Sequence, residues 1–160
     1  MTCMAGDIEQ RHFWQWRDAY CQYAAFYRCA INDAQLRRLW QWLTCEPPQV
    51  FGIVAESGGE LWGIAHWRVH PHPLAGRMTA YLDDLFVLPD RRGIGIGKML
   101  TEECALRASK SGCNRLRWAT AKDNFNAQKL YDKIAKRTGW LIYDLDIAPD
   151  IGAGEGAKNQ

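Results

Sequence analysis

The stretch Ala80-Tyr-Leu-Asp-Asp-Leu-Phe-Val-Leu-Pro-Asp-Arg-Arg-Gly-Ile-Gly-Ile-Gly-Lys98 decides the fold of this chain. Its first half is apolar and β-prone, and Pro89 ends that pattern, which predicts a buried strand over residues 79–87. The glycines that follow expose the loop backbone, so its N–H groups can approach a ligand, and a helix beginning near Gly97 adds the positive end of its dipole. Such a loop is typical of an anion site, most often for phosphate. The glycines and basic residues are Gly93, Gly95, Gly97, Arg91, Arg92 and Lys98.

Two common phosphate-binding patterns do not fit this loop. The nucleoside-triphosphate P-loop needs a glycine five residues before Gly97 and a Ser or Thr after the lysine, but Arg92 and Met99 stand there. The dinucleotide pattern Gly-x-Gly-x-x-Gly fails because its last position falls on Lys98 or Leu100. The pattern that fits is Arg/Gln-x-x-Gly-x-Gly/Ala, here Arg92-Gly-Ile-Gly95-Ile-Gly97.

That pattern, directly after a strand ending Asp84-Leu-Phe-Val87, resembles the acetyl-CoA loop of the GNAT superfamily of N-acetyltransferases. A second stretch, Trp118-x-Thr-x-x-x-Asn124-x-x-Ala127-x-x-Leu130-Tyr131, is similar to the family's pattern downstream of that loop. The resemblance covers roughly residues 50–147. It implies a single-domain α/β fold with a mixed central β-sheet flanked by helices, in which strands 79–87 and 115–119 splay apart to admit the pantetheine arm.

The resemblance also implies acetyl-CoA as cosubstrate and assigns roles to residues. Asn124 would contact the pantetheine, and Tyr131 would donate a proton to the leaving thiolate. Their separation of seven residues is about two helical turns, so both lie on one helix face. From the residues alone, Asn124 is equally a helix N-cap and Tyr131 a core tyrosine. The residues expected to bind acetyl-CoA are Leu85, Phe86, Val87, Arg92, Gly93, Ile94, Gly95, Ile96, Gly97, Lys98 and Asn124.

Asp83 and Asp84 are the acidic residues expected at the amine end of the site. A lysine-like amine has a pKa of ~10.4, so about one molecule in 2,500 is neutral at pH 7 and a base is needed. A regular strand would turn the two carboxylates to opposite faces, whereas a bulge would change that. By resemblance to the diamine acetyltransferases, Asp83 would be the base, through a water, and Asp84 would attract the substrate or brace the loop. The alternative is that one of them is structural.

Composition limits the other functions. A net charge of +2 over 160 residues is too small to indicate nucleic-acid binding. No apolar run approaches the ~18 residues that cross a bilayer, and the N-terminus lacks a signal-peptide stretch, so we expect a soluble cytoplasmic protein. None of the six cysteines forms Cys-x-x-Cys, which indicates reduced thiols, and we expect no metal site.

The order of predicted elements is helices, a three-stranded antiparallel meander, then strand–helix–strand–helix–strand. The crossover after Val87 implies that strands 79–87 and 115–119 are parallel. Residues 1–147 would form the domain and 148–160 a flexible tail. The predicted helices are 7–27, 33–43, 97–111 and 124–137; the strands are 51–56, 61–69, 79–87, 115–119 and 141–147, with 2–5 a short strand or a frayed end and 70–77 a loop.

The leading prediction is an N-acetyltransferase that moves acetyl from acetyl-CoA to a primary amine by direct attack in a ternary complex. The acceptor would be a small amine, a polyamine, an amino acid or a lysine side chain. The alternative is a non-catalytic CoA-binding regulatory module, against which Tyr131 and the acidic pair argue. Many relatives are homodimers, but the sequence settles neither the acceptor nor the oligomeric state. Candidate aromatic walls for the acceptor pocket are Trp14, Trp16, Tyr20, Tyr27, Trp62 and Trp67.

Overall fold

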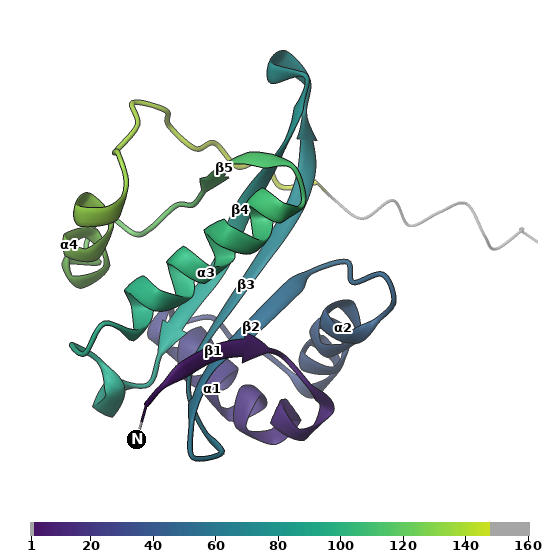
Figure 1. Ribbon diagram of the computed structural model, residues 1–160, viewed down its shortest axis with the longest axis vertical. Coiled ribbons are helices and arrows are strands. Elements are labelled where there is room, and N and C mark those ends of the chain that lie inside the picture. The colour runs from purple at the N-terminus through teal and green to yellow at the C-terminus, as the bar shows by residue number, and fades with distance from the viewer. Residues whose placement is uncertain (1, 148–160) are drawn as a thin grey trace, which may run out of the picture.

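A computed structural model describes residues 2–147, and the tail predicted for 148–160 lies outside them (Figure 1). The described chain forms one mixed five-stranded sheet with four helices. The strands are β1 (Met4–Asp7), β2 (Phe51–Ser57), β3 (Glu60–His72), β4 (Arg77–Val87) and β5 (Cys113–Arg117). The helices are α1 (Phe13–Phe26), α2 (Asp33–Thr44), α3 (Ile96–Lys110) and α4 (Phe125–Ile134).

The strands follow one another across the sheet in the order β1-β2-β3-β4-β5. The first three pairs are antiparallel and β4–β5 is parallel, which confirms the predicted meander and crossover. Gly58 and Gly59, with φ of 60° and 82°, close the β2–β3 hairpin. Positive φ at both positions is what a two-residue hairpin turn requires.

The two faces of the sheet are covered by different helices (Figure 1). Leu100, Cys104 and Ala108 of α3 recur every four residues, so they form one buried stripe against β2, β3 and β4. Leu106 lies two residues from Cys104, on another side of the helix, and is 50% exposed. On the other face, α1 and α2 bury Trp16 and Leu36 beside the sheet.

The parallel pair β4–β5 opens partway along its length. Their ladder runs from Met78↔Cys113 to Tyr81↔Arg117, whereas β4 continues to Val87. Beyond Tyr81 the backbone of β4 therefore has no described strand on its β5 side. This is the splay that the family resemblance implied, and it leaves backbone N–H and C=O groups available to a bound chain.

The predicted helix from Asp7 is wrong in its first turns. Residues Met4–Asp7 form β1, because they find a ladder partner at the edge of β2. A short 3₁₀ turn follows, closed by reciprocal bonds between Glu9 and His12, and α1 begins at Phe13.

The predicted loop 70–77 is also largely wrong. β3 continues to His72 and pairs with β4 as far as His72↔Arg77. Pro71 is tolerated there because β2 stops pairing at Trp67, so β3 is an edge on one side.

The final strand predicted over 141–147 does not form in the described residues. The segment is irregular, and Leu141 and Tyr143 are exposed. β-Prone residues form a strand only where they hydrogen-bond to a neighbouring strand, and no described strand pairs with this segment. The preceding helix also ends early, at Ile134 instead of residue 137. No helix among residues 2–147 has the length and apolarity to cross a membrane.

Candidate active site

A β-bulge in β4 brings both acidic residues to one face of the sheet. The β3–β4 register shifts after His66, which pairs with Asp84, and leaves Asp83 as the extra residue on β4. His66 and Arg68 are two apart on β3, so they share a face, and they bond to Asp84 and Asp83 respectively. Both carboxylates therefore reach the α1 face, which a regular strand would not allow.

Asp83 is held by an exposed arginine. Arg68 Nε donates to Asp83 Oδ2 at 2.8 Å, and Arg68 Nη2 donates to Asp83 Oδ1 at 2.6 Å. Such a two-pronged pair occupies both carboxylate oxygens. The role of base predicted for Asp83 stays untested, but in this geometry each of its oxygens already accepts one bond from Arg68.

Asp84 has a more buried setting, with its side chain 15% exposed. Its Oδ2 atom accepts from His66 Nδ1 at 2.9 Å and from the Tyr20 hydroxyl at 3.3 Å. Burial first, and the charge of Asp84 second, raise the pKa of both Tyr20 and Tyr23. These phenols therefore keep their protons at neutral pH.

An aromatic cavity of about 490 Å³ lies between the C-terminal half of α1 and residues 119–121, and one of its lining residues, Tyr20, contacts Asp84. Tyr20, Tyr23 and Tyr27 line it, and no lysine or arginine is among its described lining residues. Tyr20 and Tyr27 were expected in an acceptor pocket; Tyr23 was missed, although its spacing on α1 puts it on the same helix face. The other predicted walls lie elsewhere: Trp16 and Trp67 in the core, Trp14 in solvent and Trp62 under Arg91.

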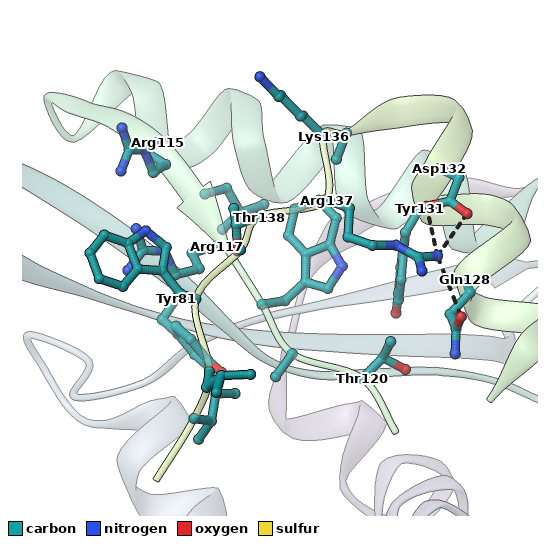
Figure 2. Close-up of a pocket in the computed structure, with 18 of the residues that line it drawn as sticks. Tyr81, Arg115, Arg117, Thr120, Gln128, Tyr131, Asp132, Lys136, Arg137 and Thr138 are labelled. Atoms are coloured by element: carbon teal, nitrogen blue, oxygen red, sulfur yellow. Dashed lines mark hydrogen bonds and ion pairs between the residues drawn. The ribbon is translucent and has the colours of Figure 1, made fainter. Parts of the chain in front are cut away.

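Tyr131 lies in a second cavity, of about 1190 Å³, between β5, α4 and residues 135–142 (Figure 2). Its ring packs edge-on against Trp118 at 5.2 Å. Burial first, and Tyr27 second, raise the pKa of Tyr131 to about 12, so the phenol is protonated at neutral pH. Ala119 and Thr120 line both cavities, so Tyr131 stands next to the aromatic cavity.

The glycine-rich loop has the exposed backbone that a phosphate site needs. Gly93 and Gly95 have φ of 82° and 93°, and a Cβ at either would meet nothing within 4 Å. Gly95 caps α3 without a side-chain bond, and the helix ladder begins with Met99 N–H donating to the Gly95 carbonyl. The N–H groups of the first helical turn therefore do not donate to carbonyls within the helix, so they can donate to a bound anion. At Gly97 a Cβ would lie 3.1 Å from Leu130 of α4, so α3 and α4 approach closely there.

The remaining residues predicted to bind acetyl-CoA already have partners in the fold. Arg92 Nε donates to the Val87 carbonyl at 2.9 Å, and Lys98 pairs with Glu102 at 3.6 Å. Asn124 caps α4 by accepting from Ala127 N–H at 3.2 Å, which confirms the N-cap alternative. Their contacts with acetyl-CoA remain predictions.

The five apolar residues in that set differ in exposure. Phe86 and Ile96 are buried, so only their backbone could face a ligand. Leu85 and Val87 are partly buried against the α3 side of the sheet, and Ile94 is exposed.

His66 is the functional candidate that sequence reasoning missed. It is fully buried and bonded to both Asp84 and Trp16. Its place between Ala65 and Trp67 shows that it lies on the face opposite to them, but its pairing with Asp84 depends on the bulge. A bulge changes register by one residue, and the sequence pattern does not show where it occurs.

Comparisons with known proteins bear on the family and the fold of this chain. A family model described as the acetyltransferase (GNAT) family matches residues 12–135. The D-amino-acid N-acetyltransferase of Saccharomyces cerevisiae is 33% identical over 85 residues, covering 53% of this chain and 53% of the yeast protein. The match therefore spans about half the length of that relative. The thialysine N-epsilon-acetyltransferase of Caenorhabditis elegans is 32% identical over 108 residues, covering 64% of this chain and 67% of the nematode protein.

A solved structure shares the fold. The ribosomal-protein-alanine N-acetyltransferase from Brucella melitensis biovar Abortus 2308 has a TM-score of 0.75 at 21% identity, over 92% of this chain and 100% of that one. The family model covers well over half of the present chain. The chain therefore belongs to the acetyltransferase (GNAT) family, whose members take their acetyl group from acetyl-CoA.

Proposed function

We propose that this protein transfers the acetyl group of acetyl-CoA to a primary amine by direct attack in a ternary complex. The observation that carries the proposal is the bulge in β4. It turns two carboxylates to one face, beside a tyrosine-lined cavity and at the point where β4 and β5 separate. Holding both reactants at this opening would supply most of the acceleration.

At the amine end, Asp84 is the proton acceptor that the geometry favours. Its Oδ2 atom accepts from His66 and Tyr20, which orients the carboxylate. The acceptor ammonium would give its proton to the other oxygen, Oδ1. Freeing an amine of pKa ~10.4 at pH 7 costs ~4.6 kcal/mol, and a positioned carboxylate lowers that barrier. Asp83, bound to Arg68, would contribute negative charge without taking the proton.

At the thioester end, Tyr131 donates its proton to the leaving thiolate. Because its pKa is raised to about 12, the phenol is present in its protonated form throughout the neutral range. A thiolate is a tolerable leaving group, so this donor should contribute about 10²–10³-fold, toward the low end of general-acid effects. Backbone N–H groups on the unpaired edge of β4, near Leu85–Val87, would stabilise the charge that develops on the carbonyl oxygen.

The acceptor class that we propose first is an amino acid or small diamine with a free primary amine. Tyrosine rings and nearby carboxylates suit an ammonium group. Arg68, beside Asp83, offers a guanidinium to an acceptor carboxylate. The yeast and nematode relatives are named for acceptors that are amino acids. The homodimer expected from the resemblance stays a prediction.

The test is thiol release from acetyl-CoA by the purified protein. The acceptors are D- and L-amino acids, a lysine analogue, diamines, aminoglycosides and a lysine peptide, with mass analysis of the acetylated product. We expect release that depends on one class of primary amine. Acetyl-CoA binding without release above background on any acceptor would favour the non-catalytic module.

A further inference from the structure

A chain of three hydrogen-bonded side chains runs from α1 through β3 to β4. Trp16 Nε1 lies 3.0 Å from His66 Nε2, and His66 Nδ1 lies 2.9 Å from Asp84 Oδ2. Trp16 and His66 are both 0% exposed, whereas the Asp84 side chain is 15% exposed and contacts Tyr20, which lines the aromatic cavity. Two wholly buried groups thus stand behind the carboxylate proposed to take the proton.

The chemistry of these groups assigns the protons. An indole N–H only donates, so His66 Nε2 accepts with its lone pair. The single ring proton of a neutral imidazole must then be on Nδ1, where it is donated to Asp84. Each bond in the chain therefore points from Trp16 toward the carboxylate.

A second ring proton, placed on Nε2 of His66, would have no hydrogen-bond acceptor, because Nε2 faces the Trp16 N–H. Within residues 2–147, the titratable groups in contact with its ring are Asp84 from β4 and Tyr20 from α1, whose ring centre lies 5.6 Å away. β2 presents Gly52, and Arg68 of β3 is engaged with Asp83. Asp84 by itself would favour a charged imidazolium, but a proton on Nε2 would face the Trp16 N–H donor to donor. The Trp16 indole thus opposes protonation of His66 at Nε2, whereas the Asp84 carboxylate favours it.

We propose that Trp16 is a positioning residue that locks His66 in its neutral Nδ1–H form, so that Asp84 and not His66 receives the proton of the acceptor amine. In this step an N–H bond of the ammonium breaks, an O–H bond forms on Asp84 Oδ1, and the amine keeps the electron pair for attack. Without the lock, an imidazolium would form beside Asp84 and neutralise its charge as pH falls. The use of the lock in acetyl transfer rests on the proposed function; the lock itself does not.

The test is Trp16→Phe, which removes the N–H and keeps an aromatic ring. Its matched control is Trp40→Phe: Trp40 packs on Trp16 at 4.9 Å in the same core, but its N–H is directed to Gln10. NMR of the imidazole nitrogens, recorded from pH 5 to 8, reports the tautomer of His66 directly. We expect the Nδ1–H form throughout in the wild type and in Trp40→Phe, and conversion to imidazolium at low pH in Trp16→Phe only. A His66 that gains a proton in the wild type over this range, or behaves alike in all three proteins, overturns the lock.

The kinetic readout is the ratio of kcat/KM for Trp16→Phe to that of the wild type, since the acceptor's own ionisation cancels in a ratio. The ratio should be flat above pH 7.5 and fall about tenfold for each pH unit once the imidazole is charged. Adding His66→Asn, which keeps an N–H donor toward Asp84 and cannot become an imidazolium, should make the ratio flat again. A flat ratio in Trp16→Phe while His66 is seen to titrate would overturn the role of Asp84 in the proposed function and leave the lock standing.

Discussion

The two adjacent carboxylates of β4 differ in what holds them. Asp83 gives both oxygens to Arg68, whereas Asp84 gives one to His66 and Tyr20. If Asp84 is the base, Asp84→Asn should lower kcat/KM by about 10²–10⁴-fold, and Asp83→Asn by less than about tenfold. Both changes are isosteric, so unfolding midpoints serve as the check that the fold is kept. A larger loss in Asp83→Asn would return the role of base to Asp83.

Tyr131 is predicted to act on the leaving group and not on binding. Tyr131→Phe removes the hydroxyl and keeps the ring on Trp118, so turnover should fall about 10²-fold with little change in acetyl-CoA affinity. Tyr81→Phe is the matched control, because Tyr81 lines the same cavity. Steady-state kinetics and a direct binding measurement separate the two effects. Equal turnover of Tyr131→Phe and the wild type would remove Tyr131 from the mechanism.

At the scale of the elements, the glycine loop at the start of α3 is predicted to bind acetyl-CoA, and Gly95 is the residue that tests it. Gly95→Ala adds a Cβ where φ is +93°, which should cost about 1–2 kcal/mol of stability and displace the loop backbone. Gly112→Ala is a close control, since Gly112 also has positive φ and open space but lies past the other end of α3. Only Gly95→Ala should raise the KM for acetyl-CoA. An equal rise in both variants would show that lost stability, not the loop, is the cause.

The Arg11–Glu56 pair ties the turn before α1 to β2, and it predicts an acid-sensitive contact. The Arg11 hydrogen bond first, against the effect of burial, lowers the pKa of Glu56 from 4.5 to about 2. A carboxyl with a depressed folded-state pKa stabilises the fold above pH 4.5, and this contribution is lost as pH falls from 4.5 toward 2. Unfolding midpoints over that range should decline less steeply in Arg11→Met. Parallel curves for the two proteins would exclude the pair as the cause.

The elements that the sequence predicted well are those whose signals are local. The ends of the strand before the glycine loop and of helix α3 are marked by residues next to them. These are Pro89 after the strand, Gly95 at the start of α3 and Gly112 after its end. The segment 141–147 has equal β-propensity, yet it remains unpaired, because a strand also needs a neighbour that composition does not supply. Asp83 and Asp84 could likewise be nominated from sequence, but the residues themselves carry no signal for the bulge that turns both to one face.

On the scale of the whole molecule, two adjoining cavities are the feature that the proposed ternary complex would use. The aromatic cavity lies on the α1 side, the Tyr131 cavity lies between β5 and α4, and they meet at Ala119 and Thr120. A ternary complex of this kind needs no acetylated enzyme. The residue that would offer the other route is Cys29, an exposed thiol that lines the aromatic cavity.

Initial rates measured over a grid of acetyl-CoA and acceptor concentrations separate these two routes. Direct transfer predicts double-reciprocal lines that intersect, whereas an acyl-cysteine relay predicts parallel lines, the pattern of ping-pong kinetics. Cys29→Ser should keep wild-type turnover, because no step of direct transfer uses the thiol. Cys21→Ser, on the same part of the chain but outside the lining of that cavity, is the control for any effect of losing a thiol. Parallel lines together with loss of activity in Cys29→Ser alone would replace direct attack by a relay through Cys29.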